Sequence, residues 1–328
     1  MATIKDVAQR AGVSVATVSR VINRIGAVRE ETQRVVEQAI AELGYAPNML
    51  GRHLRTMETK RILVILNSIS NQFYSRVVRG VEDCAQERGY SVTICTTRDN
   101  REKLLAHLDM LYTRSVDGAI MMFSELGPVE MKDLGKSLPL VCACEPSQTA
   151  EIPSVSIDDR QAGFDAVRFL LSRGNKRIAA FGAGNYAASS AQREVGYRQA
   201  LGEAGIPVRE EWIINEGLSF RAGQRAAERL LSCSELPDAV FAFSDSLAIG
   251  AISEFARRGL RVPEDISVMG FDDTAIAEMY LPPLTTVAQP QYEMGWKAME
   301  LLVKRMQGVD AMGNLTVPHN IVVRNSVK

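Results

Sequence analysis

The stretch SVATVSRVIN, residues 14–23, combines small and hydroxyl-bearing side chains with one arginine and one asparagine. At helical spacing Val18, Val21 and Ile22 fall on one side, where they can pack inward. The other side then presents methyl groups, hydroxyls and a guanidinium, which are the groups that contact thymine methyls, phosphates and guanine in the major groove of DNA. This pattern favours a helix that contacts DNA bases. A three-helix bundle in which the same residues only pack is the alternative.

The flanking segments predict two further short helices. Thr3 and Asp6 form a capping-box pattern at the start of one helix, which Gly12 ends. The other helix runs over residues 32–43 and is followed by a glycine. Two short helices joined by a tight turn and followed by a third predict a helix-turn-helix domain over residues 1–46.

The charge of the chain is unevenly distributed. Residues 1–60 hold nine lysines and arginines against six acidic residues, a balance of +3, and the remainder carries −4. A basic segment on an acidic body fits a module that binds a polyanion. The chain has no run of 18 apolar residues and no signal-like N-terminus, and its five cysteines are scattered. These features predict a cytoplasmic protein with reduced thiols and no membrane partner.

After residue 60 the pattern changes to apolar strands that alternate with helical stretches. Eight runs have the length and composition of buried strands: 61–66, 91–96, 118–123, 138–143, 177–182, 238–243, 265–271 and 284–289. This alternation predicts the α/β class with doubly wound parallel sheets, and the number of strands suffices for two sheets.

Residues with catalytic or metal-binding potential are few. His53, His107 and His319 are far apart and fall in no metalloprotease or triad pattern. Cys142 and Cys144 share one face of an expected strand, but no second pair of cysteines or histidines lies nearby, which favours core thiols over a zinc site. The sequence therefore predicts no catalytic residue, no metal and no cofactor. A sugar- or nucleoside-active enzyme on the same scaffold is a weakly favoured alternative.

Several longer motifs allow a comparison with known families. The N-terminal TIKDVAQRAGVSVATVSRVIN is followed by GYAPN, and the body contains SDSLAIGA, VPEDISVMGFDD, LPPLTTVAQP and IVVRNS. Over essentially its whole length the chain resembles the LacI/GalR family of bacterial transcriptional regulators. The segments PNMLGRHL, VCACEPS and AQPQYEMG are most similar to the cytidine-repressor branch of that family.

The resemblance implies an N-terminal helix-turn-helix domain and a periplasmic-binding-protein-like body of two doubly wound parallel-sheet subdomains. The expected domains are 1–46 (helix-turn-helix), 47–60 (hinge helix and linker) and 61–328 (effector binding and dimerisation). Within the last, the N-subdomain takes about 61–160 and 290–320, and the C-subdomain takes about 161–289 and 321–328. A homodimer of this kind binds near-palindromic operator DNA.

The same resemblance assigns residues to the operator. The expected DNA contacts are Ile4, Ser14, Val15, Ala16, Thr17, Ser19, Arg20 and Asn23 in the first domain, and Asn48, Gly51 and Leu54 in the hinge helix. Val15 and Ala16 occupy the two positions that, in the family, set the preference for one operator sequence over another. Leu54 is the wedge that enters the minor groove, where unstacking costs a few kcal/mol and allows a bent, better-wrapped duplex.

For a small-molecule effector, the resemblance assigns positions around a cleft at the carboxyl ends of the strands. They are Phe73, Tyr74, Glu145, Ser189, Arg193, Leu218, Ser244 and Asp272. Arg193 and Asp272 can bind vicinal hydroxyls of a sugar or a nucleoside from both sides; an Arg–Asp ion pair that only holds the cleft is the alternative. Leu218, Ser244 and Cys144 replace an aromatic residue, an asparagine and an aspartate that are frequent in relatives, so the identity of the effector stays open.

These observations together predict a repressor whose operator affinity a small polyhydroxylated effector controls. An activator or co-repressed regulator of the same family is one alternative. A ligand-binding protein without a DNA-binding role is another, but it would need an export signal and no N-terminal helical domain, and the sequence has the reverse.

A glycine at position 51 is a departure from the alanine that many relatives carry. Glycine in a helix interior costs about 1 kcal/mol relative to alanine, so the hinge helix should form less readily and tolerate changes in half-site spacing. Gly51→Ala should therefore tighten operator binding and narrow the accepted spacing, measured by fluorescence anisotropy on operators with inserted base pairs. Unchanged affinity together with unchanged spacing tolerance would contradict this prediction.

Overall fold

A computed structural model describes residues 2–23, 25–45, 58–123, 126–184, 187–309 and 313–328. The chain forms two compact units, Met1–Thr59 and Lys60–Lys328. Within the described ranges, no helix combines the length and the apolar character needed to cross a bilayer.

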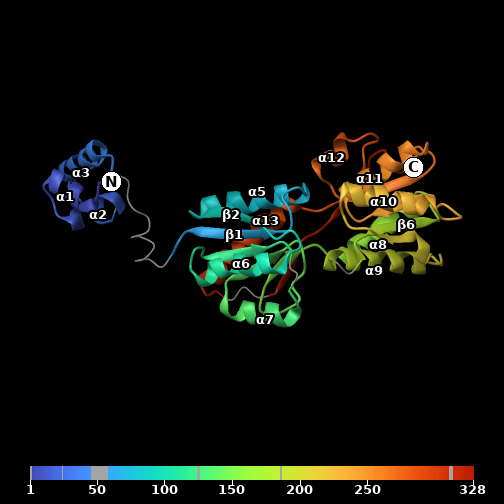
Figure 1. Cartoon of the computed structure of the whole chain (residues 1–328), viewed down its shortest axis with the longest axis horizontal. Helices are drawn as coiled ribbons and strands as arrows, with labels where there is room; N and C mark the ends of the chain where they lie inside the picture. Colours follow the sequence, from blue (N-terminus) through green and yellow to red (C-terminus); the bar gives the residue numbers. More distant parts are fainter. Residues whose placement is uncertain (1, 24, 46–57, 124–125, 185–186, 310–312) are drawn as a thin grey trace. The chain divides into compact units, whose positions relative to one another are not determined.

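The described part of the first unit contains the helices α1 (Ile4–Ala11), α2 (Val15–Asn23) and α3 (Glu30–Leu43), drawn in blue in Figure 1. The predicted capping box is present at the start of α1, where Asp6 and Thr3 bond to each other's backbone N–H groups. Val7, Val18 and Val36, one from each helix, are fully buried and form the centre of a small core. The helix-turn-helix prediction is confirmed.

The second unit begins with an alternation of strands and helices. Its elements are β1 (Arg61–Leu66), α5 (Phe73–Glu87), β2 (Ser91–Thr96), α6 (Arg101–Tyr112), β3 (Gly118–Met121), α7 (Pro128–Ser137), β4 (Leu140–Ala143) and β5 (Ser154–Ser156). The five strands of this list and β11 (Asn314–Thr316) form a parallel six-stranded sheet in the order β11-β5-β4-β3-β1-β2. Helices α5 and α13 (Gln291–Met306) cover one face of this sheet, and α6 and α7 cover the other (Figure 1). Ile62 and Val64 of β1 belong to the core under the first pair, and Leu63 and Ile65 belong to the core under the second.

The other half of the unit repeats this pattern. It contains α8 (Asp159–Ser172), β6 (Ile178–Gly182), α9 (Ala188–Glu203), a 3₁₀ turn (Glu210–Trp212), β7 (Ile213–Asn215), α10 (Phe220–Leu231), β8 (Ala239–Ala242), α11 (Asp245–Arg257), β9 (Ser267–Asp272), α12 (Ala275–Met279), β10 (Thr285–Ala288) and β12 (Asn320–Val322). The sheet order is β12-β10-β9-β8-β6-β7, with β12 antiparallel to β10 and the other pairs parallel. Helices α8 and α9 cover one face, and α10 and α11 cover the other. The predicted architecture of two doubly wound sheets is confirmed.

All eight predicted strands are present, although most are shorter than their apolar runs. Four further strands, β5, β7, β11 and β12, did not appear in the sequence pattern. Each has three residues, which is too short to show an alternation, and each forms because a neighbouring strand supplies its hydrogen-bond partners.

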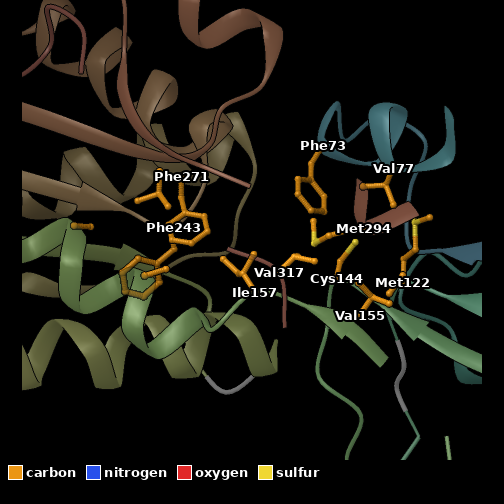
Figure 2. Packing of buried hydrophobic residues seen from close by; sticks show 14 of the residues in the cluster. Phe73, Val77, Met122, Cys144, Val155, Ile157, Phe243, Phe271, Met294 and Val317 are labelled. Carbon is orange, nitrogen blue, oxygen red and sulfur yellow. The ribbon is translucent and has the colours of Figure 1, made fainter. Parts of the chain in front are cut away.

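The chain passes between the two sheets three times: after β5, after β10, and between β11 and β12. Two of these crossings run side by side, because the Val317 N–H donates to the Ser156 carbonyl at 2.9 Å. Figure 2 shows Ile157 and Val317, which lie on these two crossings, between Phe243 on one side and Cys144 on the other. One continuous apolar cluster therefore links the two halves.

Three pairs of helices pack through facing glycines. The pairs are Gly80 and Gly295 between α5 and α13, Gly163 and Gly196 between α8 and α9, and Gly223 and Gly250 between α10 and α11. A Cβ atom on Gly196 would lie 2.1 Å from the carbonyl oxygen of Arg160. Because the obstacle is backbone rather than a flexible side chain, these crossings accept only glycine.

Helix α9 offers a matched pair of substitutions to test this packing. Gly196→Ala should destabilise the protein by about 1–3 kcal/mol or more, as overpacking does. Gly202→Ala, in the same helix, should be neutral or stabilising by up to about 1 kcal/mol, because nothing lies within 4 Å of a Cβ at that position. Urea unfolding of the two variants measures both effects, and equal stability would refute the close approach of α8 and α9.

Candidate functional site

Helix α2 carries the predicted DNA-contacting residues on a well-defined local frame. Ser14 caps the helix, since its Oγ accepts from the Thr17 N–H at 3.2 Å and lies 2.9 Å from the Thr17 Oγ1. Val18 is buried in the core, while Val15, Ala16 and Arg20 are exposed. The small residues and the guanidinium therefore lie on the accessible side of α2, as contact with base edges requires.

Ile4, Ser19 and Asn23 are less accessible than these residues. Asn23 donates from Nδ2 to the Ser19 carbonyl at 2.7 Å and to the Ser19 Oγ at 3.3 Å, so both side chains are engaged within the helix. Ile4 is half-buried and packs against the core of the first unit. Asn48, Gly51 and Leu54 lie outside the described residues.

The eight predicted effector residues belong to the second unit, where they follow the carboxyl ends of strands. The set consists of Phe73 and Tyr74 at the start of α5, Glu145 after β4, Ser189 and Arg193 in α9, Leu218 after β7, Ser244 after β8 and Asp272 at the end of β9. Ligands of open α/β sheets bind at these ends, because the strands stop there and the loops to the next helices leave space.

Arg193 is almost fully buried and makes three interactions. Its Nε donates to Asp159 Oδ1 at 2.8 Å, its Nη1 donates to the Phe243 carbonyl at 2.6 Å, and its guanidinium stacks 3.6 Å from the centre of the Phe271 ring. The ion pair of Arg193 is thus with Asp159 and not with Asp272, the carboxylate expected beside it. Through this one side chain, α9 contacts α8, the end of β8 and strand β9.

Asp159 is a residue that the sequence did not single out. It opens α8 and is 4% exposed, and its Oδ2 has no hydrogen-bond partner among the residues that the structure describes. Burial raises the pKa of this carboxyl, and Arg193 opposes the rise. The signal available in the sequence was the acidic pair in SIDD, but it follows a strand too short to be predicted.

Asp272 ends β9 with a backbone conformation that is unusual for a residue with a side chain, at φ 115°. Its Oδ1 accepts from Gln289 Nε2 at 2.8 Å and its carbonyl accepts from Gln291 Nε2 at 2.5 Å. Burial raises the pKa of the Asp272 carboxyl well above its usual range, and Arg193 opposes the rise. Cys144 also has positive φ, at 72°. Strained backbone of this kind concentrates at functional sites.

Glu145 joins the two halves of the unit. Its Oε2 accepts from the Ser189 N–H at 2.9 Å and its Oε1 accepts from the Ser189 hydroxyl at 2.6 Å. Because Ser189 lies in the first turn of α9, whose own N-cap residue makes no side-chain cap, the carboxylate caps that helix from the other sheet. Burial raises the pKa of Glu145 to about 7, against the hydrogen bonds from Ser189.

The aromatic pair at the start of α5 lies close to these carboxyls. Phe73 is buried, and its ring meets that of Tyr74 edge-on at 5.4 Å. Burial raises the pKa of Tyr74, and the charges of Glu145 and Asp272 raise it further. Residues of both halves therefore form one polar cluster.

Two of the predicted effector residues have structural contacts of their own. The Ser244 Oγ donates to the Leu218 carbonyl at 2.8 Å and accepts from the Leu247 N–H, which caps α11. Leu218 is half-buried and packs against the apolar cluster that links the two halves and against the core under α10 and α11. Neither contact tests a role in effector binding, so both assignments stay predictions. In the described part of the chain, no group of His, Cys, Asp or Glu could hold a metal ion.

A helix-turn-helix unit joined to a body of two doubly wound sheets defines a DNA-binding transcriptional regulator. Residues 3–48 match the bacterial regulatory proteins of the lacI family, and residues 167–327 match the periplasmic binding protein-like domain. Catabolite control protein A of Priestia megaterium is 39% identical over 99% of both chains. The transcriptional repressor CytR of Escherichia coli K12 is 38% identical over 100% of this chain and 96% of its own.

Solved structures agree with this assignment. The lac repressor dimer bound to operator and the anti-inducer ONPF has a TM-score of 0.91 and 28% identity, and the match covers 99% of this chain and 98% of that one. The chain belongs to the lacI family of bacterial regulatory proteins.

The raised pKa of Glu145 leads to a pH-dependent difference in stability. The folded state holds this proton up to a pH of about 7, whereas a glutamate in the unfolded chain loses it near 4.5. The contribution of Glu145 to stability therefore falls as the pH rises from about 4.5 through 7, since the folded state binds more protons in that window. Glu145→Gln keeps an acceptor for Ser189 and removes the titration.

We expect the melting temperature of Glu145→Gln to rise relative to that of the unmodified protein as the pH increases from 5 to 8. Circular dichroism at each pH measures the difference. The exposed Glu264 provides the control, and Glu264→Gln should give a flat difference over the same range. A flat difference for Glu145→Gln as well would mean that its carboxyl titrates as it does in water.

Proposed function

We propose that this regulator is a repressor whose operator affinity is controlled by a small polyhydroxylated effector, a sugar or a nucleoside, bound around Arg193, Asp272 and Glu145. The observation that carries the proposal is the match, over nearly the whole of both chains, to a repressor bound to operator DNA and to a small anti-inducer. The polar cluster at the strand ends supports it, because its carboxylates and its serine can exchange hydrogen bonds with hydroxyl groups.

Control follows from a difference in affinity between two states. Glu145 in one half bonds to Ser189 in the other, so a ligand that binds here changes the balance between arrangements of the two halves. In a homodimer this change reaches two DNA-binding units related by two-fold symmetry, which calls for a near-palindromic operator. The regulator acts in the cytoplasm, where its operator DNA lies, and the proposal assigns no catalytic step to the cluster.

Arg20 tests the DNA-binding half of the proposal. With an operator selected from a random DNA library, Arg20→Ala should weaken binding by about 1–3 kcal/mol and relax the preference at one symmetric base pair. Arg34→Ala, which removes an exposed charge from α3, is the control and should leave the preference unchanged. A uniform loss over all sequences would show that Arg20 contacts only phosphate.

Asp272→Asn tests the effector half without changing the size of the side chain. It is preferable to a change of Arg193, which would leave Asp159 buried without its partner at a cost of about 3–5 kcal/mol. The variant should bind operator normally and require more effector for release, titrated by anisotropy against a panel of sugars and nucleosides. Tighter operator binding with effector would mean a co-repressed regulator. No response of the unmodified protein to the panel would overturn this half of the proposal.

A further inference from the structure

A cavity lies at the amino end of β6, away from the strand ends that carry the candidate effector residues. It is formed by the residues just before β6, the last part of α9, the loop after α9 and the 3₁₀ turn before β7. Helix α9 carries Ser189 of the effector set in its first turn and Leu201 of the cavity near its end. At a rise of about 1.5 Å per residue, these two positions lie about 18 Å apart along the helix. The cavity is therefore separate from the candidate effector site.

The inner lining of the cavity is apolar and well fixed. Ile178, Leu201 and Trp212 line it and are almost fully buried, and Ile206 and Pro207 line it from the loop after α9. The Trp212 ring is held in place because its Nε1 donates to a backbone carbonyl at 3.3 Å. A lining of this kind offers water few hydrogen bonds, so it favours the apolar part of a ligand.

The charged side chains that line the cavity all have the same sign. They are Lys176, Arg177 and Arg209, and no acidic residue of the described chain lines the cavity with them. Arg177 pairs with Asp238 at 3.8 Å, and Arg209 pairs with Glu235, so both arginines are neutralised from outside the cavity. The Lys176 ammonium forms no ion pair with any residue that the structure describes. One positive charge at the cavity is therefore left for a ligand.

The size and charge of the cavity define the ligand that fits it. Its volume is about 220 Å³, which is below the roughly 300–1,000 Å³ of pockets for drug-sized molecules and leaves room for a single ring. An aromatic ring is favoured over a puckered one, because cations are attracted to its faces; the Arg209 guanidinium already lies 4.7 Å from the centre of the Trp212 ring. One unpaired ammonium matches one negative charge, and a carboxylate supplies that charge with two acceptor oxygens.

We propose that this cavity is a second ligand site of the regulator, which binds a small aromatic carboxylate with one ring. The ring lies against the apolar lining formed by Ile178, Leu201 and Trp212. The carboxylate accepts hydrogen bonds from the Lys176 ammonium at the mouth of the cavity. The site does not depend on the effector function proposed above, because none of its residues belongs to the effector set.

Tryptophan fluorescence of the full chain gives a readout inside the cavity. The chain has two tryptophans, so Trp296→Phe leaves Trp212 as the only one. Titration with benzoate should change its emission saturably at millimolar concentration or below. Benzamide, which has the ring without the charge, should bind about tenfold or more weakly, and cyclohexanecarboxylate, which has the charge without the flat ring, should also bind more weakly. No saturable change, or an equal affinity for benzoate and either of the other two compounds, overturns the inference.

A pair of lysine substitutions tests the charge without relying on the tryptophan variant. Calorimetry on the otherwise unmodified chain should show that Lys176→Met binds benzoate about tenfold more weakly and binds benzamide as before. Lys304→Met, which removes an exposed lysine from α13, is the control and should leave both affinities unchanged. Benzoate binding that is unaffected by Lys176→Met would contradict the proposal.

Asp272→Asn separates this site from the candidate effector site. Asp272 ends β9 at the opposite edge of the sheet, so this variant should bind benzoate with unchanged affinity in the same calorimetric titration. A loss of benzoate binding in Asp272→Asn together with normal binding in Lys176→Met would place the carboxylate at the strand ends and refute a second site.

Discussion

The buried ion pair between Arg193 and Asp159 is the interaction on which the effector-binding half of the molecule depends. It joins α9 to α8, and the same guanidinium reaches the end of β8 through the Phe243 carbonyl and lies on Phe271 of β9. A charge taken out of water is stable only when its partners are in place. The positions of two helices and two strand ends are therefore set by one side chain, at the point where the candidate ligand site is formed.

The close packing of α8 and α9 is what brings this pair together. Gly163 and Gly196 let the two backbones approach, and a Cβ on Gly163 would lie 2.5 Å from the carbonyl oxygen of Arg193 itself. The same arrangement of facing glycines recurs between α5 and α13 and between α10 and α11. We expect closely packed helix pairs of this kind to move as units, so that a change at the site is passed on as a change between the halves.

The two halves are joined less rigidly than the helices within each half, because part of the connection consists of hydrogen bonds that a ligand can replace. Three crossing segments, an apolar cluster around Ile157 and Val317, and the bonds from Ser189 to Glu145 join the two sheets (Figure 2). The hydrogen bonds can be exchanged for bonds to a ligand at little net cost, because each replaces another of similar strength. A small molecule with a few well-placed donors can thus bias the arrangement of the whole body, which is the requirement for allosteric control.

The sequence by itself determined the helix-turn-helix unit, the two doubly wound sheets and the exposed character of Val15, Ala16 and Arg20, because these features depend on local periodicity, caps and turn residues. Family resemblance added the strand-end positions of the effector residues. Only the tertiary structure decided that Arg193 pairs with Asp159, which lies 34 residues away in the chain, and that Glu145 caps α9 from the other sheet. Several acidic residues were available to one guanidinium, and which of them it meets depends on how helices distant in sequence pack, which no local pattern encodes.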